Sequence, residues 1–172
     1  MRDSSKFKDD SHLSSDVLLE KLSDLGISYS KFLHPPLFTV QDAKKYQKDM
    51  VGLHVKNLFL RDKKKNNFLI VAEQDSQIDL KFLHEKIGSN RLSFGSSDRL
   101  MEFLGVRPGA VSPLALINDI SNSVKLFFDS SLDSQETLHF HPLINDITIG
   151  IKLSEFYRFL KFTGHKLTFV KI

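Results

Sequence analysis

The segment GLHVKNLFLRDKKKNNFLIV, residues 52–71, constrains the fold more than any other part of the chain. Two apolar runs flank a turn with consecutive lysines, a pattern that predicts two β-strands joined by a charged turn. Side chains alternate between the faces of a strand, so His54 shares a face with Lys56, and Val55 shares the other with Asn57. Both faces also carry apolar residues, so neither is an ordinary solvated face. Lys56 must therefore find a partner, reach water or occupy a site that uses its charge.

Length and composition set the limits on what the chain can be. The 172 residues fit one domain with a sizeable core, and 15 phenylalanines without tryptophan indicate a Phe-rich interior. The absence of cysteine excludes disulfides, a thiol nucleophile and thiolate metal sites. A net charge of +3 permits a nucleic-acid partner without demanding one. No apolar run approaches the roughly 18 residues of a membrane span, and no secretory signal is visible, so we expect cytoplasmic residence without membrane association.

The rest of the chain mixes helix and strand signals in irregular order. We expect a flexible tail over residues 1–13 and one domain over residues 14–172. The predicted N-caps of the helices are Ser15, Thr39, Asp79, Ser97 and Ser154. The predicted strands beyond the opening segment lie near residues 27–33, 91–94, 124–129, 146–151 and 166–170. This mixture predicts an α+β fold with a mixed sheet.

Common catalytic templates are absent from the sequence. There is no GxSxG elbow, and the glycines of GVRPGAV match neither nucleotide-binding fingerprint. His139 and His141 would share one face of a strand, a spacing compatible with a metal, but no third ligand is evident nearby, and such histidines more often pack or hydrogen-bond. Closely spaced carboxylates for magnesium are also missing. We therefore expect no metal and no other cofactor.

Three polar segments lie inside apolar surroundings: HVKN, RPGAVSP and HFHPLIND. Together they suggest a pocket built from a strand lysine, a glycine loop and a His-Pro turn. Each has a structural alternative, since Lys56 could extend to solvent, Gly109 and Pro113 could shape a turn, and His141 could end a strand. Their coincidence favours function without naming a reaction.

Several segments in the same order resemble a known family. HVKNLFLRDKK, RLSFGSSDRLMEFLGVRPGAVSPLALIND, FHPLIND and FLKFTGH, with HPPLFTV earlier, are similar to the YbaK/prolyl-tRNA-synthetase-associated domain, and most of all to its free-standing ProX-type members, which deacylate alanyl-tRNA(Pro). The resemblance runs from about Leu18 to the C-terminus. It implies a compact α+β fold with a mixed, barrel-like sheet flanked by helices. It also implies hydrolysis of the ester that joins a wrong amino acid to tRNA.

The family's functional positions can be carried over onto this sequence. The resemblance implies that the catalytic residues are Lys56, Asn57 and His141, and that the substrate-binding residues are Gly109, Ala110, Val111, Ser112, Pro113 and Asn145. Lys56 would stabilise negative charge while water attacks the ester, helped by the 2′-hydroxyl of the terminal ribose. The sequence departs from the family at Val55, where relatives commonly have threonine, and at Asp146 and Ile147.

Specificity would rest on size. A site made for proline cannot strongly exclude alanine, because a missing methylene is worth only about 1–3 kcal/mol, so a second, smaller site would remove the error. The sequence offers Val55, Phe59, Leu114 and Ile144 as apolar walls of that site. The expected partners are the acceptor end of mischarged tRNA(Pro) and prolyl-tRNA synthetase. Two alternatives stay open: a cysteinyl-tRNA(Pro) deacylase and a non-catalytic module that binds tRNA or the synthetase.

Overall fold

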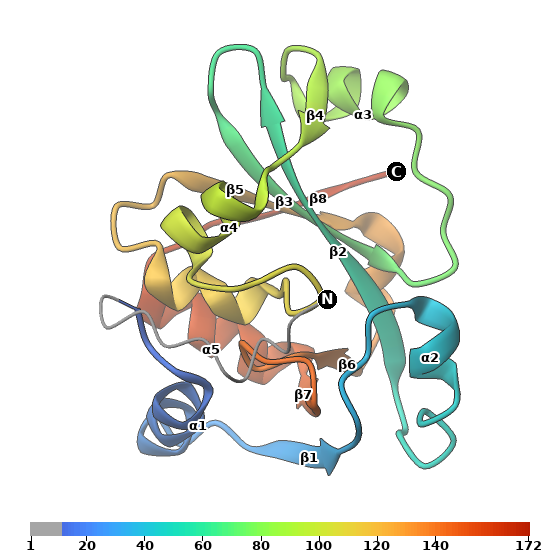
Figure 1. The fold of residues 1–172 in the computed structure, drawn as a ribbon, viewed down its shortest axis with the longest axis vertical. Coiled ribbons are helices and arrows are strands. Elements are labelled where there is room, and N and C mark those ends of the chain that lie inside the picture. Colours follow the sequence, from blue (N-terminus) through green and yellow to red (C-terminus); the bar gives the residue numbers. More distant parts are fainter. Residues whose placement is uncertain (1–11) are drawn as a thin grey trace.

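Within residues 12–172, a mixed sheet of eight strands organises the fold (Figure 1). The computed structural model describes residues 12–172, so residues 1–11 of the predicted tail lie outside the described residues. The strand order is β1-β7-β6-β2-β3-β5-β8, with β4 paired to β2. The strands are β1 (Tyr29–Leu33), β2 (Leu53–Asp62), β3 (Asn67–Glu73), β4 (Leu92–Phe94), β5 (Val124–Asp129), β6 (Thr137–Phe140), β7 (Ile147–Lys152) and β8 (Leu167–Val170). Parallel and antiparallel pairs both occur, which confirms the predicted α+β class with a mixed sheet.

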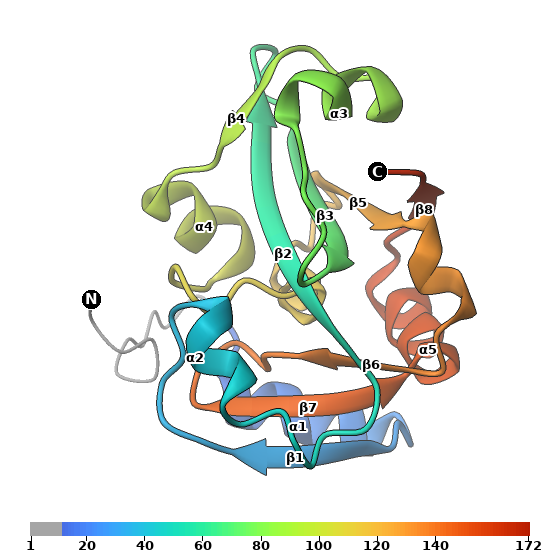
Figure 2. The ribbon, with the colours of Figure 1, turned by 90° about the vertical axis from the view of Figure 1, so that its right-hand side faces the viewer.

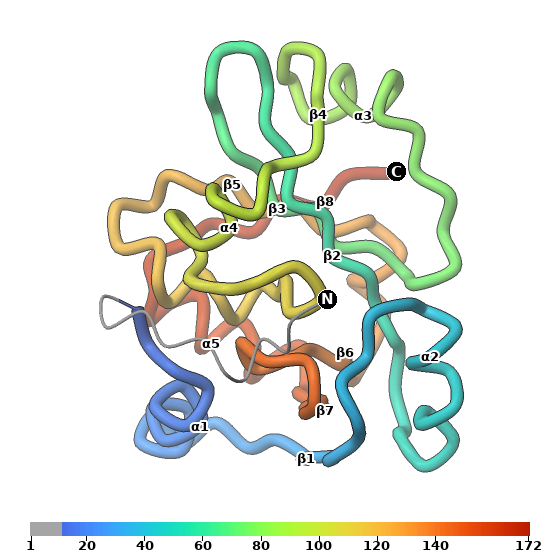
Figure 3. Tube along the Cα trace, viewed as in Figure 1, coloured from blue at the N-terminus to red at the C-terminus, as the bar shows by residue number. Residues whose placement is uncertain are grey.

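Short helices surround the sheet (Figures 1 and 3). The helices are α1 (Ser15–Asp24), α2 (Val40–Lys44), α3 (Leu80–Ile87), α4 (Ser97–Leu104) and α5 (Leu153–Thr163), with 3₁₀ turns η2 (Pro113–Asn118) and η3 (Ser130–Ser134). Figure 3 shows the C-terminal end running toward α3, where Ile172 packs against a small core cluster. None of the helices within residues 12–172 is long and apolar enough to cross a bilayer.

Strand β2 connects the two parts of the sheet. Its first residues, Leu53 and His54, pair in parallel with β6, and its remainder pairs antiparallel with β3 and β4. Figure 2 shows β2 rising away from β1, β7 and β6, which lie together at its lower end. The lower part of β2 therefore contributes to one layer while its upper part forms an arm with β3, β4 and α3.

The two faces of β2 pack into different cores, as the alternation of side chains predicts. Val55 and Phe59 contact the large cluster, which α1, α4, β5, β7 and α5 complete. Leu58 and Leu60 contact a second, smaller cluster beneath α3. Gly95 fits beside Phe59 because a Cβ there would come within 2.3 Å of the Phe59 ring. The predicted hairpin is thus confirmed, with both of its faces buried.

Helix capping follows the sequence in part. Thr39 and Asp79 accept hydrogen bonds from backbone N–H groups and begin α2 and α3, as predicted. Ser14 and Ser96, each one residue earlier than predicted, cap α1 and α4. Adjacent serines offer the same hydroxyl, so the sequence alone does not distinguish the two positions.

The start of α5 differs from the prediction. Ser154 does not cap this helix, because it begins at Leu153 directly after β7, with Lys152 in the cap position and no side-chain cap. At the N-terminal side of the domain, the Leu13 N–H donates to Asn118 Oδ1 at 2.9 Å. Contacts with the domain therefore begin before α1, inside the segment predicted as a tail.

Candidate active site

A cavity of about 240 Å³ lies between α2, the lower part of β2, the Gly109 loop and the β6–β7 segment. Its ionisable lining residues are His54, Lys56, His139 and His141. None of the described residues that line it is an aspartate or a glutamate. Within residues 12–172 no three His, Cys, Asp or Glu side chains gather in a way that could hold a metal ion.

The structure brings some of the predicted site residues to this cavity and leaves others behind it. The predicted residues that line the cavity are Lys56, Asn57, Gly109, Val111 and His141. The predicted residues that are buried outside its lining are Ala110, Ser112, Pro113 and Asn145. The side chains of this second group support the loop instead of reaching the cavity, and their local contacts explain why.

The Gly109 loop is held in place by those buried residues. The Ser112 hydroxyl accepts from the Leu114 N–H and begins η2, while the Ala110 N–H donates to the Arg107 carbonyl at 3.1 Å. Asn145 Nδ2 donates to the Leu37 carbonyl at 3.1 Å. Gly109 has φ +93°, a conformation that side chains rarely adopt, so the backbone can face the cavity there.

Lys56 and Asn57 are half-buried in the cavity wall. The Lys56 ammonium contacts the carbonyl oxygen of Ser76, and Lys56 is the lysine among the described lining residues. The Asn57 Oδ1 atom is buried without a hydrogen-bond partner among the described residues. Consecutive residues of β2 direct these side chains to opposite sides of the strand, so Lys56 and Asn57 would meet different parts of a polar substrate.

Two histidines from neighbouring strands that are far apart in sequence form one wall of the cavity. The rings of His54 and His139 stack with centroids 4.4 Å apart and an angle of 8°. Gly150 lies opposite His139 in the β6–β7 register, and a Cβ there would come within 2.9 Å of the His139 ring. Gly52 also makes room for that ring, because a Cβ there would lie 3.0 Å from His139 Nε2. The stacked pair therefore depends on the absence of a Cβ at Gly52 and Gly150, and on the parallel pairing of β2 with β6.

Both stacked histidines stay neutral near neutral pH. Burial, reinforced by the neighbouring His139, lowers the pKa of His54 to about 4. Burial also lowers the pKa of His139 below its ordinary value, although a hydrogen bond with the Val51 carbonyl opposes the shift. His54 Nε2 and His139 Nδ1 are buried without partners among residues 12–172.

His141 occupies the turn that follows β6. Its Nδ1 hydrogen-bonds to the Ile147 carbonyl at 2.8 Å, and because a carbonyl only accepts, that nitrogen carries the proton. Burial holds the pKa of His141 below its ordinary value, so its Nε2 is a neutral acceptor. Leu143 in this turn has φ 68°, an uncommon conformation for a branched residue. Such local strain is found where a turn must place a side chain accurately.

The apolar walls differ from those that the sequence suggested. Val55 lines the cavity, but Phe59 and Leu114 are buried in the large core, and Ile144 packs against it. The apolar lining is instead formed by Leu37, Phe38, Val40, Met50, Val111 and Phe140. The HPPLFTV segment contains Leu37, Phe38 and Val40, whereas Met50 lies outside every motif of the sequence.

Sequence reasoning also missed polar lining residues. Gln47 and Gln74 exchange two side-chain hydrogen bonds, of 3.0 and 3.1 Å, across the edge of the cavity. Thr148 lines the cavity from β7, and its hydroxyl lies 2.7 Å from His34 Nε2. The two residues of each pair are far apart in sequence, so no local sequence pattern predicts that they meet.

The chain is similar to proteins with related names and folds. The profile of the aminoacyl-tRNA editing domain matches residues 34–159. The prolyl-tRNA editing protein ProX of Acetoanaerobium sticklandii is 36% identical over 157 residues, covering 91% of this chain and 96% of the relative. The prolyl-tRNA synthetase associated domain-containing protein 1 of Mus musculus is 36% identical over 153 residues, covering 86% and 90%.

Solved structures show the same fold at lower sequence identity. A candidate trans-editing enzyme for prolyl-tRNA synthetase superposes with a TM-score of 0.68 at 18% identity, covering 93% of this chain and 99% of the other. The hypothetical protein APE2540 superposes with a TM-score of 0.69 at 19% identity, covering 89% and 97%. The arrangement of strands and helices around the cavity is thus shared well beyond recognisable sequence similarity.

Proposed function

The chain belongs to the aminoacyl-tRNA editing domain family and is an aminoacyl-tRNA deacylase, and from that premise we propose that it removes alanine from mischarged tRNA(Pro). The observation that carries the proposal is a cavity of about 240 Å³ whose described lining combines apolar side chains with the lysine Lys56. Alanine carries a single methyl group, which such a cavity can enclose. We further propose that the enzyme acts in the cytoplasm, after a prolyl-tRNA synthetase has released the wrong product.

The reaction needs positioning and charge stabilisation more than a strong nucleophile, because an aminoacyl ester is already activated. Water adds to the ester carbonyl, the bond to the ribose oxygen breaks, and alanine and free tRNA are released. The Lys56 ammonium would exchange its contact with the Ser76 carbonyl for the developing oxyanion or the terminal phosphate. Backbone N–H groups of Gly109 and Val111 would face the same region, since the Ala110 N–H is already used.

Asn57 and His141 would orient the reacting groups. Both residues line the cavity; the Asn57 Oδ1 atom has no hydrogen-bond partner among the described residues, and the His141 Nε2 atom is an acceptor. Either acceptor can bind the attacking water or the 2′-hydroxyl of the terminal ribose. The neutral state of His141 suits this role, because a protonated ring could not accept.

The decisive experiment compares amino acids on one tRNA. We expect purified protein to release alanine from alanyl-tRNA(Pro) much faster than proline from prolyl-tRNA(Pro), because an editing site must discriminate against the larger proline ring. Cysteinyl-tRNA(Pro) is the third substrate in the series. Faster release of cysteine would assign the protein to the broader group of cysteinyl-tRNA(Pro) deacylases, and equal rates for alanine and proline would reject selection by size.

A further inference from the structure

Neighbouring strands direct several polar side chains to the same face of the lower layer. Thr148 and Gly150 lie two residues apart on β7 and therefore share a face. His139 is directly opposite Gly150, and His54 is directly opposite His139. Thr148 thus stands on the same face as the stacked histidines, at the side of the cavity nearest His34.

The direction of the Thr148 hydroxyl follows from the hydrogen bonds around His34. His34 Nδ1 lies 2.9 Å from the carbonyl oxygen of Pro35, and because a carbonyl only accepts, Nδ1 carries the proton. In the neutral imidazole, His34 Nε2 is then an acceptor, so at 2.7 Å the Thr148 O–H donates to it. With its single hydrogen used, Thr148 presents only lone pairs to a ligand. The residue is 7% exposed, so the hydroxyl has little freedom to turn elsewhere.

Two donor groups at this end of the substrate can meet a wall of acceptors: the 2′-hydroxyl of the terminal ribose, for which Asn57 and His141 provide acceptors, and the α-amino group of the aminoacyl moiety. Phosphate oxygens and the ester carbonyl accept hydrogen bonds, whereas the α-amino group of the aminoacyl moiety donates several in either protonation state. No carboxylate lines the described cavity, so a neutral acceptor must hold this amine, and the hydrogen bond between Thr148 and His34 orients one such acceptor, Thr148 Oγ1. The histidines of the same wall do not repel it, because burial lowers the pKa values of His54, His139 and His141.

We propose that Thr148 Oγ1 binds the α-amino group of the aminoacyl moiety, and that His34 is the positioning residue that turns the Thr148 lone pairs toward it. This inference rests on the proposed function and adds a specificity contact to it. Lys56 would hold the negatively charged side of the substrate and Thr148 the amine. The two contacts come from different strands and would fix the ester carbonyl between them.

The test uses two acyl groups on the same tRNA(Pro). Alanyl-tRNA carries the amine, and propionyl-tRNA is the same ester without it. Thr148→Val keeps the shape of the side chain and removes the hydroxyl, so we expect the ratio of kcat/KM for alanyl over propionyl ester to fall about tenfold, as for loss of one strong hydrogen bond. Thr148→Ser should retain the ratio. Thr168→Val, on the exposed edge strand β8, is the matched control.

His34 is tested by the same ratio. His34→Phe removes the acceptor that orients Thr148 and should lower the ratio, whereas His34→Gln places an amide oxygen near the position of Nε2 and should restore it. A general loss of packing would lower both rates together and leave the ratio unchanged.

The outcomes separate this inference from the proposed function. If the unaltered protein cleaves no alanyl-tRNA(Pro), the proposed function fails. If it cleaves the substrate but Thr148→Val leaves the ratio unchanged, only the amine contact is overturned. If neither the unaltered protein nor any variant cleaves the propionyl ester, the rates of Thr148→Val and Thr148→Ser on alanyl-tRNA(Pro) are compared instead. Equal rates for these two variants would overturn the proposed contact.

Discussion

Two buried polar clusters in this protein use their hydrogen-bonding groups in opposite ways. In the first, Asp119 accepts from the Ser123 hydroxyl, from the Ser123 and Val124 N–H groups, and lies 2.8 Å from His165 Nε2. In the second, the stacked His54 and His139 each leave one ring nitrogen without a partner among the described residues. The first cluster lies away from the cavity, and the second forms part of its wall.

The difference separates groups whose hydrogen bonds hold the fold from groups that keep unused hydrogen-bonding capacity next to the cavity. Burial alone would raise the pKa of Asp119, but hydrogen bonds from His165, Ser123 and Val124 outweigh burial and hold that pKa below its ordinary value. This carboxylate ties the end of η2 to β5 and to the loop after α5. A buried polar atom without a partner destabilises the fold, so its presence beside a cavity points to a role in binding.

The comparison predicts its largest effect at Lys56. Lys56→Ala should lower the rate of deacylation about 10³-fold, because it removes the positive charge that faces the ester, while leaving the melting temperature nearly unchanged. Lys125→Ala is the matched control, since Lys125 also lies on a strand but is exposed beside the Phe68 ring. Single-turnover hydrolysis of alanyl-tRNA(Pro) measures both. Full activity of Lys56→Ala would remove Lys56 from the mechanism.

The second prediction concerns the Asp119 cluster, where we expect the opposite of the Lys56 result: a loss of stability without a loss of activity. Asp119→Ala should lower the free energy of unfolding by about 3 kcal/mol, because it leaves His165 and two backbone N–H groups buried without an acceptor. Urea unfolding measures the loss, with the exposed Asp24→Ala as control. The rate of deacylation per folded molecule should be unchanged. A stable Asp119→Ala variant with reduced activity would break the distinction between the two clusters.

The third prediction concerns pH. The pKa of His54 is lowered from 6.5 to about 4 in the folded protein, so between these values the unfolded chain binds more protons. The free energy of unfolding should therefore fall as pH drops from 6.5 toward 4, and His54 should contribute about 1–2 kcal/mol of this loss once its partial exposure is allowed for.

His54→Phe isolates that contribution, because it keeps a stacked ring that does not titrate. The difference in unfolding free energy between the variant and the unaltered protein should change across this pH range and level off above pH 6.5. Asp119 affects stability in a separate pH range. Because its pKa is lowered, its contribution to the free energy of unfolding is lost only as pH falls below the ordinary carboxyl value of 3.8. Parallel curves for the two proteins would contradict the assignment to His54.

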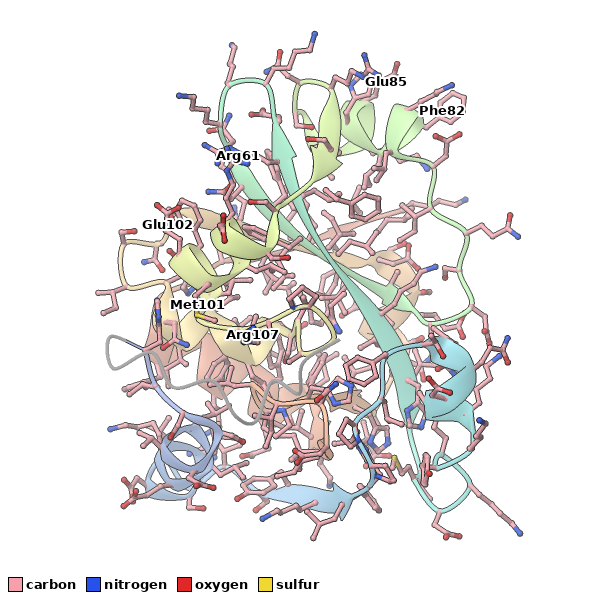
Figure 4. The ribbon with its side chains drawn as sticks, viewed as in Figure 1. Arg61, Phe82, Glu85, Met101, Glu102 and Arg107 are labelled. Atoms are coloured by element: carbon pink, nitrogen blue, oxygen red, sulfur yellow. The ribbon has the colours of Figure 1, made fainter. Side chains whose placement is uncertain are left out.

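The smallest expected effect lies in the β2–β3 turn, outside both clusters. Lys63, Lys64 and Lys65 are exposed at the far end of β2 from the cavity, on the arm where Figure 4 shows Arg61, Phe82 and Glu85. If the arm meets the acceptor stem, replacing the three lysines with alanine should weaken tRNA binding. The slope of log affinity against log salt should flatten by about 0.7–0.9 for each lysine that binds a phosphate in the unaltered protein.

A minimal aminoacyl-ester substrate serves as the control for the lysine turn. Its hydrolysis should be unaffected by the triple replacement, because the turn does not line the cavity. An unchanged salt slope with full-length tRNA would leave the turn as ordinary surface.

Local elements of the fold were largely predictable from the sequence. The hairpin of β2 and β3, the caps at Thr39 and Asp79 and the ends of α3 and α5 at glycines depend on neighbouring residues alone. The cap positions that shifted, Ser14 and Ser96, did so by one residue between equivalent hydroxyls. The resemblance of several ordered segments to one family also located Lys56 and the Gly109 loop.

Tertiary structure decided which of the candidate side chains meet. The alternation of residues along β2 determined that Lys56 and His54 share a face, because strand geometry is local. The parallel pairing of β2 with β6 and the absence of a Cβ at Gly150 decided that His139 stacks on His54. The neutral state of these rings and the direction of the Thr148 hydroxyl arise from burial and from carbonyls distant in the chain, such as Val51 for His139. Such environments depend on packing among separate strands, which no single segment encodes.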